Sequence, residues 1–328
     1  MSSPKYDVKE PAFLDHPKHE RFSHRAFDII TVGSATLDVF LKTPREIQKH
    51  HNTELCYHLG DKIVINNLRM SSGGGGTNTA VAFARLGLHT GFLGVLGNDP
   101  QASIIIQELK KENLDFLGKQ KLGMTGYSVI LASDHDRVIL SYKGVNDQLS
   151  PQDIPSHLKT SWIYMATMLN KSLSTEKILA HQAKKSGIKV AANMSSYLAQ
   201  QGLKKLSSFI KLLDVLILNK EELSILTKKS NTEKSLRLLG PHIPLVIMTN
   251  GPNSIQVIHH GKIIIKKVPP TKKIVNTTGA GDAFASGVIY GLIKGKPLEK
   301  SLEYGIQEAK SVLQHQGAKL GLLRKLKV

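Results

Sequence analysis

Apolar and polar positions follow a regular order along the second half of this chain, with short apolar runs separated by longer amphipathic stretches. The pattern predicts four strands and three helices in alternation, at 161–166, 175–186, 189–193, 203–212, 215–219, 220–227 and 245–249. Strands that alternate with helices are typical of a sheet covered by helices on both faces. We therefore predict an α/β fold with a doubly wound, mainly parallel sheet.

The first half of the chain departs from this alternation. A buried strand at 27–33 fits the parallel sheet, but the segments 54–59 and 62–68 flank the turn signal Gly60-Asp61 as the strands of a hairpin would. No helix separates these two segments. We therefore predict that they belong to a β insertion rather than to the main sheet.

A second hairpin is predicted further along the chain. The segments 126–131 and 137–143 alternate in polarity on either side of Ser133-Asp134. Together the two hairpins predict a small inserted β-sheet, a lid with segments at about 39–71 and 124–145. Because an antiparallel lid exposes strand edges and one apolar face, we expect a homodimer formed through it.

Polar residues recur where the predicted strands end. Asp38 follows the strand 27–33, and Asn193, Asn219 and Thr249 end later strands, with a glycine-rich loop at Gly279 beyond them. Ligands of open α/β sheets bind at the carboxyl ends of the strands. We therefore expect these five positions to contribute to one site.

Length and composition define the class of protein. A chain of 328 residues that is 41% hydrophobic is long enough for one large core, so we expect a single domain at 26–328 after a polar extension at 1–25. No run approaches the roughly 18 apolar residues of a membrane span, and the extension lacks a signal-peptide core. Cys56 is the only cysteine, which excludes an intramolecular disulfide. We expect a cytoplasmic protein with no membrane partner.

The formal net charge of +18 raises the question of a nucleic-acid partner. Basic pairs such as Lys110-Lys111, Lys184-Lys185 and Lys272-Lys273 are spread along the whole chain, without interleaved aromatic residues and without zinc-finger spacing. We expect a solvated lysine-rich surface and no nucleic-acid partner. A basic rim would still attract a nucleoside triphosphate.

The segment Asn276-Thr277-Thr278-Gly279-Ala280-Gly281-Asp282 carries the strongest chemical signal. An apolar helix pattern begins at Ala283, so the small residues lie at a helix start, where unpaired N–H groups and the helix dipole favour an anion. Asp282, in the first turn, is expected to stay ionised and to deprotonate a hydroxyl. The alternative is a plain helix cap whose glycines only let the loop turn.

Two common nucleotide motifs are absent. Gly118-Lys119, Gly261-Lys262 and Gly295-Lys296 are not followed by Ser or Thr, so the Walker A loop is excluded. A second glycine-rich segment, Ser72 to Asn78, leads into a helix predicted at 79–86, but Thr79 stands where a dinucleotide fingerprint needs its third glycine. A nicotinamide enzyme is therefore not predicted.

Both glycine-rich segments match one family. Gly73-Gly74-x-Gly76-x-Asn78-x-Ala80 and Thr277-x-Gly279-Ala280-Gly281-Asp282-Ala283-Phe284-x-Ser286-Gly287 resemble the two signatures of the PfkB carbohydrate kinases, the ribokinase-like fold. The resemblance runs from about Phe27 to Lys319. It implies ATP-dependent phosphorylation of a primary hydroxyl of a small sugar, in the manner of ribokinase or fructokinase, with ATP and Mg²⁺ as cofactors.

The resemblance also assigns roles to residues. Asp282 would be the catalytic base, and the amides of Gly279, Ala280 and Gly281 would form the anion hole for the transferred phosphoryl group. The implied substrate-binding residues are Asp38, Gly73, Gly74 and Asn78. The implied ATP-binding residues are Asn193, Asn219, Glu222, Thr249, Gly251 and Thr277, with Glu222 holding Mg²⁺ through water.

Two positions depart from the family pattern. Asn276 stands where the second signature usually has the Asp that helps to hold a monovalent-cation loop, which puts potassium activation in doubt. Gly75 replaces a lysine of ribokinases proper, which weakens ribose as the acceptor. A nucleoside kinase of the adenosine or cytidine type shares the same motifs, and a catalytically silent sugar-binding protein and a nucleic-acid binder are the alternatives from other classes.

Overall fold

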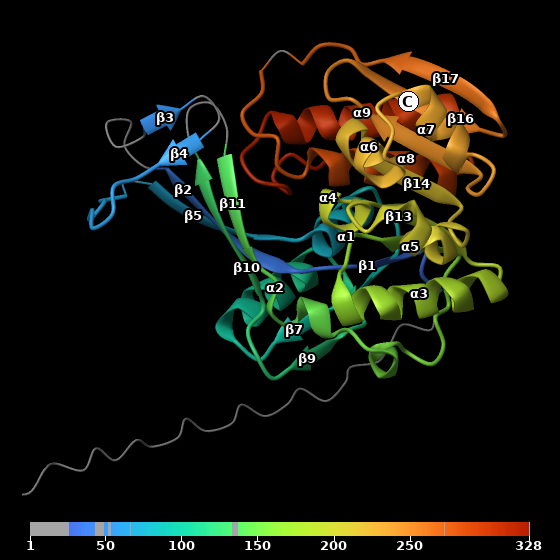
Figure 1. The fold of residues 1–328 in the computed structure, drawn as a ribbon. Helices are drawn as coiled ribbons and strands as arrows, with labels where there is room; N and C mark the ends of the chain where they lie inside the picture. Colours follow the sequence, from blue (N-terminus) through green and yellow to red (C-terminus); the bar gives the residue numbers. More distant parts are fainter. Residues whose placement is uncertain are drawn as a thin grey trace, which may run out of the picture.

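A computed structural model describes residues 26–42, 49–51, 54–65, 67–132, 137–271 and 273–327 (Figure 1). Within these residues nine strands form one large sheet and four form a smaller one. The expected N-terminal extension and the Ser133-Asp134 turn lie outside the described residues. The α/β fold with a small additional sheet is confirmed.

The large sheet is mainly parallel. Its strands are β1 (Ile29–Val32), β6 (Thr90–Leu93), β8 (Asp115–Phe116), β12 (Trp162–Met165), β13 (Lys189–Asn193), β14 (Val215–Asn219), β15 (Leu245–Thr249), β16 (Ser254–His259) and β17 (Lys262–Lys267). They lie in the order β17-β16-β15-β14-β13-β12-β1-β6-β8, and only the pairs β15·β16 and β16·β17 are antiparallel. The carboxyl ends of the parallel strands therefore meet along one edge.

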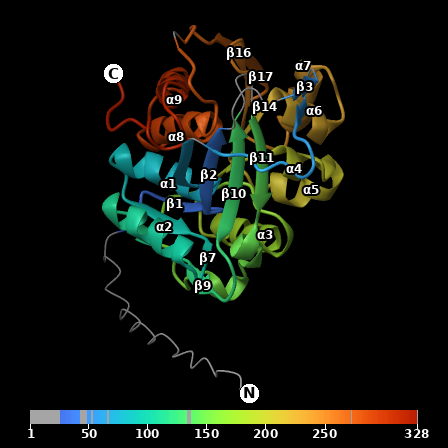
Figure 2. The same cartoon turned by 90° about the vertical axis from the view of Figure 1, so that its left-hand side faces the viewer.

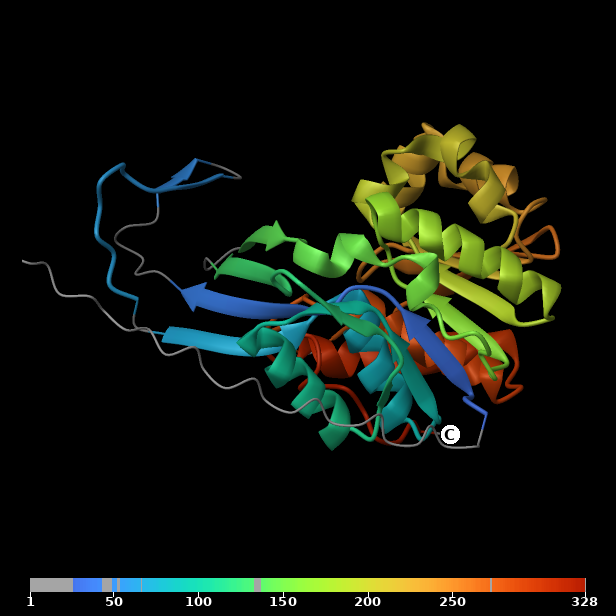
Figure 3. The same cartoon turned by 90° about the horizontal axis from the view of Figure 1, so that it is seen from below.

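Helices cover both faces of this sheet. They are α1 (Gly75–Arg85), α2 (Pro100–Lys111), α3 (Asn170–Lys185), α4 (Ser196–Ala199), α5 (Gly202–Ile210), α6 (Lys220–Thr227), α7 (Thr232–Leu239), α8 (Ala280–Ile293) and α9 (Leu298–Leu313). Figure 2 shows α1, α8 and α9 on one side and α3, α5 and α6 on the other, and Figure 3 shows the same two layers from below. This is the doubly wound arrangement predicted from the sequence.

Alternation along each strand divides the core between the two faces. On β1, Ile30 and Val32 pack in the cluster that contains apolar residues of α3, α5, α6 and α7, whereas Ile29 packs with residues of α1, α8 and α9. Both clusters consist of fully or nearly fully buried side chains. The packing fixes α8 against the sheet and so fixes the position of the residues at its first turn.

The small sheet projects from the main body (Figure 1). Its strands are β2 (Thr36–Lys42), β5 (Asn67–Gly73), β10 (Gly126–Ala132) and β11 (Arg137–Tyr142), in the order β11-β10-β2-β5. The pair β10·β11 is antiparallel, as predicted, while β2 and β10 run parallel. The sheet therefore combines two hairpin-like edges around a parallel centre.

Two short strand pairs and two 3₁₀ turns complete the described elements. Strands β3 (Lys49–His51) and β4 (Glu54–Cys56) pair antiparallel, and β7 (Val95–Gly97) pairs parallel with β9 (Lys119–Lys121). Two 3₁₀ turns lie at Gly144–Gln148 and Pro151–Asp153.

The predicted hairpin of 54–59 with 62–68 is wrong. Residues 57–65 form no strand, β4 pairs with β3, and β5 pairs with β2. Gly60 does lie in a turn, but the partner of β5 is a segment 25 or more residues earlier, which a local turn signal does not reveal. The helix expected at 79–86 begins earlier, at Gly75, so half of the first glycine-rich segment is helical.

Candidate functional site

Asp282 lies in the first turn of α8, as predicted, and Gly279 shapes that helix start. Gly279 has a φ of 78°, and a Cβ at this position would come within 2.4 Å of the Ala318 Cβ, so only glycine fits. Within the described residues, the amides of Gly279, Gly281 and Asp282 have no hydrogen-bond acceptor, and the Ala280 amide makes only a 3.4 Å contact with the Thr277 carbonyl. These N–H groups are available to an anion.

Asp282 receives a hydrogen bond from the first glycine-rich segment. The Asn78 Nδ2 atom donates to Asp282 Oδ2 over 2.8 Å, although the two residues are 204 positions apart. Burial raises the pKa of Asp282 to about 6, while the Asn78 hydrogen bond and the Lys319 charge oppose that rise. Desolvation thus outweighs the helix terminus, which favours the ionised form. The carboxylate is still mostly ionised at pH 7.

Two cavities meet at Asp282. The first cavity has a volume of about 230 Å³, and its lining includes Gly75, Lys143, Asn193, Tyr197 and Asp282. The second cavity has a volume of about 210 Å³, and its lining includes Asn193, Asn219, Glu222, Thr249, Gly281 and Asp282. A proton acceptor that borders both spaces is placed between whatever molecules occupy them.

A third, larger cavity of about 490 Å³ continues from the second. The two share Thr249, Gly281 and Phe284, and Ile255 and Val268 give the third cavity its apolar wall. Gly251, Thr277 and Ala280 also line it. The three cavities form a row in which a space of mixed lining, a more polar space with free amides and an apolar space follow one another.

Asn219 and Glu222 cap the start of α6. Asn219 Oδ1 accepts from the Glu222 amide over 2.9 Å, and Glu222 Oε2 accepts from the Asn219 amide over 2.7 Å, which is a complete capping box. Burial raises the pKa of Glu222 to about 7, and the charges of Glu221 and Asp282 add to the rise. A cation near Glu222 would hold it in the ionised form.

The residues of the second cavity fit a magnesium ion that is held mainly by phosphate. Among the residues that the structure describes, no three His, Cys, Asp or Glu side chains lie close enough to hold a metal ion by themselves. Mg²⁺ is commonly bound by one or two carboxylates together with substrate phosphates and water. Glu222 can supply one such carboxylate, and the phosphates would have to supply the rest.

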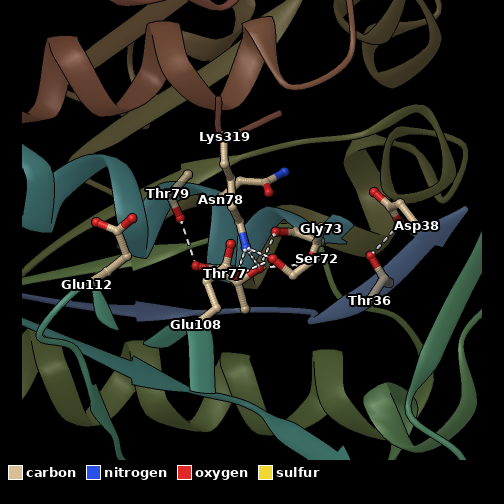
Figure 4. A network of polar contacts seen from close by, with 12 residues as sticks. Thr36, Asp38, Ser72, Gly73, Thr77, Asn78, Thr79, Glu108, Glu112 and Lys319 are labelled. Atoms are coloured by element: carbon tan, nitrogen blue, oxygen red, sulfur yellow. Dashed lines mark hydrogen bonds and ion pairs between the residues drawn. The ribbon is translucent and has the colours of Figure 1, made fainter. Parts of the chain in front are cut away.

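Asp38 does not lie at a strand end of the large sheet, which corrects that prediction. The turn at 33–35 leads the chain from β1 into β2, and Asp38 stands in the middle of β2, on the small sheet. Its Oδ1 accepts from Thr36 Oγ1 over 2.8 Å (Figure 4), and burial raises its pKa. A Cβ at Gly73 would come within 1.9 Å of Asp38 Oδ2, so Gly73 leaves room for this carboxylate.

The expected substrate-binding residues lie beside the first cavity rather than in its lining. Gly73 and Gly74 use their carbonyls within the segment, accepting from Thr77 Oγ1 and the Asn78 amide. Asn78 Oδ1 is buried and has no hydrogen-bond partner among the described residues. Asp38, Gly73, Gly74 and Asn78 thus stay a prediction as direct ligands, while Asn78 is shown to contact Asp282.

Sequence reasoning missed Lys319. Its Nζ donates to Ser72 Oγ over 2.7 Å, to Thr77 Oγ1 over 3.0 Å and to Glu108 Oε2 over 2.8 Å (Figure 4), and its side chain is 7% exposed. Lys319 therefore joins the segment after α9 to the first glycine-rich segment and to α2. No periodic pattern marks this lysine, because it lies in irregular chain.

Contacts of β11 and of the turns next to the small sheet connect it to the site. Arg137 of β11 donates to Thr277 Oγ1, and Asn146 exchanges two hydrogen bonds with the backbone of Ala35, at 3.0 and 2.9 Å. Lys143, directly after β11, lines the first cavity. In the loop before α8, Asn276 Oδ1 accepts from the Thr278 amide over 2.6 Å, so this side chain bonds within its own loop.

The sequence matches the model of a family described as pfkB family carbohydrate kinase over residues 28–325. An uncharacterized sugar kinase of Archaeoglobus fulgidus is 26% identical over 253 residues, which cover 74% of this chain and 99% of that protein. The 5-dehydro-2-deoxygluconokinase of Geobacillus thermodenitrificans is 29% identical over 263 residues, covering 74% and 78%.

Solved structures agree in fold. Adenosine kinase of Sinorhizobium meliloti superposes with a TM-score of 0.79 at 21% identity, covering 90% of this chain and 96% of that one. Ribokinase of Thermotoga maritima superposes with a TM-score of 0.75 at 21% identity, again covering 90% and 96%. None of the described helices has the length and apolar character needed to cross a bilayer.

Proposed function

Because this chain belongs to the pfkB family of carbohydrate kinases, we propose that it transfers the γ-phosphoryl group of ATP to a primary hydroxyl of a small sugar. The observation that carries the proposal is the position of Asp282, which borders the first and second cavities at a helix start with free amides. A base between an acceptor space and an anion space is the arrangement that phosphoryl transfer needs.

In this proposal Asp282 accepts the proton of the sugar hydroxyl as the hydroxyl attacks the γ-phosphorus. The pKa of about 6 leaves the carboxylate ionised at neutral pH and close to the operating range of a general base. The amides of Gly279, Ala280 and Gly281 receive the charge of the transferred group, and positioning with charge stabilisation supplies most of the rate.

ATP fits the other two cavities. The apolar third cavity suits the adenine ring, with Thr249, Gly251 and Thr277 at its border, and the second cavity suits the phosphates beside Asn193 and Asn219. Mg²⁺ would neutralise charge on the phosphates when bound, with Glu222 as its protein carboxylate. Because Asn276 bonds to its own loop, we do not expect activation by potassium.

The acceptor class has two candidates. A sugar acceptor is supported by relatives that are named as a sugar kinase and as a 5-dehydro-2-deoxygluconokinase. It is also supported by the ribokinase of Lactococcus lactis, which is 25% identical over 303 residues. The alternative, a nucleoside, is favoured by the exposed ring of Tyr197 in the first cavity, on which a base would stack.

We also propose a homodimer formed through the small sheet. Strand register places Leu68 and Met70 of β5 on the same face as Val138, Leu140 and Tyr142 of β11, and all five are more than 40% exposed. A second copy of the chain would cover this apolar face. Asp38 lies on the opposite face, so the dimer would leave the site side of the sheet accessible. The cytoplasmic location stays a prediction.

The direct test is an ADP-release screen over pentoses, hexoses, keto-deoxy acids and nucleosides, run with the wild type and with Asp282→Asn. We expect one acceptor class to release ADP and the variant to lose at least about 10²-fold in kcat while it still binds ATP. Activity of the variant within about tenfold of the wild type would refute the role of Asp282. Selective use of adenosine or cytidine would decide for the nucleoside kinase.

A further inference from the structure

Lys143 occupies an unusual position for a lysine. It follows β11, lines the first cavity and is partly buried, and its Nζ lies 5.5 Å from the centre of the Tyr197 ring. Among the described residues no carboxylate lies within ion-pair distance of this ammonium. The ring contact holds the chain over Tyr197 without neutralising its charge.

Three other buried or partly buried lysines have a carboxylate partner, whereas Lys177 and Lys310, which are also partly buried, have none among the described residues. Lys121 pairs with Asp153 at 2.5 Å, Lys266 with Glu303 at 3.1 Å, and Lys319 with Glu108 at 2.8 Å. A lysine withdrawn from water is stabilised by such a partner. Lys143 has no such partner among the described residues, and unlike Lys177 it lines the first cavity, where a bound anion could pair with it.

The two carboxylates that line this cavity each accept a hydrogen bond from an asparagine. Asp147 accepts from Asn170 Nδ2 over 2.7 Å, and Asp282 accepts from Asn78. The charge of Lys143 acts on Asp38, whereas the charged groups that act on Asp282 are Lys319 and Asp38. Lys143 and Asp282 both line the first cavity, so one bound molecule can reach both side chains.

We propose, building on the kinase function above, that the acceptor is an anionic sugar whose carboxylate or phosphate ester binds Lys143 while its primary hydroxyl faces Asp282. Such a molecule carries both groups that the lining can bind, an anion for Lys143 and a hydroxyl for Asp282. A neutral sugar or a nucleoside would leave the Lys143 charge without a partner.

The test compares acceptors that carry an anionic group with matched acceptors that lack it. ADP release and calorimetric binding are measured with gluconate against glucitol and with fructose 6-phosphate against fructose, then with five-carbon and keto-deoxy acids against their polyols. In the wild type we expect one anionic series to exceed its neutral counterparts by at least about tenfold in kcat/KM or affinity. The preferred series tells carboxylate from phosphate ester.

Variants at Lys143 test whether this side chain causes the preference for an anionic acceptor. Lys143→Met is expected to weaken the anionic acceptor about 10- to 100-fold through KM, the loss expected for a charge-assisted hydrogen bond, with the KM for ATP unchanged. Lys143→Arg should keep most of the affinity. The control is Lys177→Met, a partly buried lysine of α3 that borders none of the three cavities and should change nothing.

Three results would overturn the proposal: neutral acceptors equal to or better than anionic ones, an equal loss for both in Lys143→Met, or a raised KM for ATP in that variant. The kinase function fails separately, if the wild type releases no ADP with any acceptor of the screen. In that case the binding comparison still decides whether the cavity selects an anion.

Discussion

The contact between Asn78 and Asp282 determines where the rate falls at low pH, which is the acid limb of the pH–rate profile. The carboxylate is the reactive form, and burial raises its pKa to about 6 even with the 2.8 Å hydrogen bond from Asn78 in place. Since that bond stabilises the ionised form, its removal must raise the pKa further. We therefore choose Asn78→Ala as the perturbation.

The size of the shift can be worked out. A hydrogen bond to a charged group contributes about 1.5–3 kcal/mol, and one pKa unit corresponds to about 1.4 kcal/mol, so the pKa should rise by about one to two units. The limb of the wild type near pH 6 would move to about pH 7–8. At pH 5 the wild type itself should keep only about a tenth of its plateau rate, because about a tenth of Asp282 is ionised one unit below its pKa.

The assay is kcat/KM for the acceptor between pH 5 and 9, because this quantity reports the pKa values of the free enzyme. Thr79→Val is the matched control: Thr79 is a buried polar neighbour on α1 whose hydroxyl bonds to Gly75 and Gly76 and not to Asp282. Its limb should stay near pH 6.

A limb that stays within about 0.3 unit of the wild type in a folded Asn78→Ala protein would refute the reasoning. In that case either the titrating group is not Asp282, or the Asn78 hydrogen bond does not lower the pKa of Asp282. A limb that moves to lower pH would contradict the sign of the argument as well.

Three further predictions concern stability and assembly. Because the pKa of Asp282 is raised on folding, protonation of Asp282 favours the folded state, and the free energy of unfolding falls as pH rises from about 4 to 6. We therefore expect Asp282→Asn to be more stable than the wild type by up to about 3 kcal/mol at pH 7.5 and little different at pH 4. Urea unfolding at the two pH values measures this difference. Lys319→Met should lower the free energy of unfolding by a few kcal/mol, because it leaves the partly buried Glu108 without its partner. The same change should shift the low-pH limb of the rate profile to higher pH, because the Lys319 charge lowers the pKa of Asp282. Adding Glu108→Gln should restore the stability but leave the limb at the higher pH. The double variant Met70→Lys and Leu140→Lys should convert a dimer to a monomer, as measured by light scattering. Ile265→Lys, a change at a similarly exposed apolar position on β17, should leave the dimer intact. A monomeric wild type would contradict the proposed interface.

The regular half of the fold could be predicted because its signals are local. The strands at Lys189–Asn193, Val215–Asn219 and Leu245–Thr249 have the predicted bounds, and Asn193, Asn219 and Thr249 do line one cavity at their ends. Each apolar run is long enough to be buried on both faces, so no distant partner is needed to recognise it.

The small sheet could be predicted only in part. Its existence followed from alternation and turn residues, but β5 pairs with β2 and β2 pairs with β10, contacts between segments far apart in the chain. A turn such as Gly60-Asp61 carries no information about such pairings. The displacement of Asp38 from a strand end to the middle of β2 has the same origin, because the turn at 33–35 changes sheets instead of ending in a helix.

Residues in irregular segments were beyond prediction. Lys143 follows a strand and Lys319 lies after the last helix, so neither belongs to a periodic pattern, and one basic residue among 44 lysines and arginines has no distinguishing neighbour in the sequence. The place of Asp282 at a helix start predicts an ionised carboxylate, but the rise of its pKa to about 6 could not be predicted, because the depth of burial is not visible in the sequence.

The burial of Asp282 has a consequence for how this protein changes under selection. A carboxylate that is ionised where the fold prefers it neutral opposes stability, so a laboratory population selected for heat tolerance alone should lose Asp282 early, to asparagine or another neutral residue. Selection that includes turnover should keep it. The residue at this position in a homologue would therefore indicate whether that lineage has been maintained for catalysis or only as a folded protein.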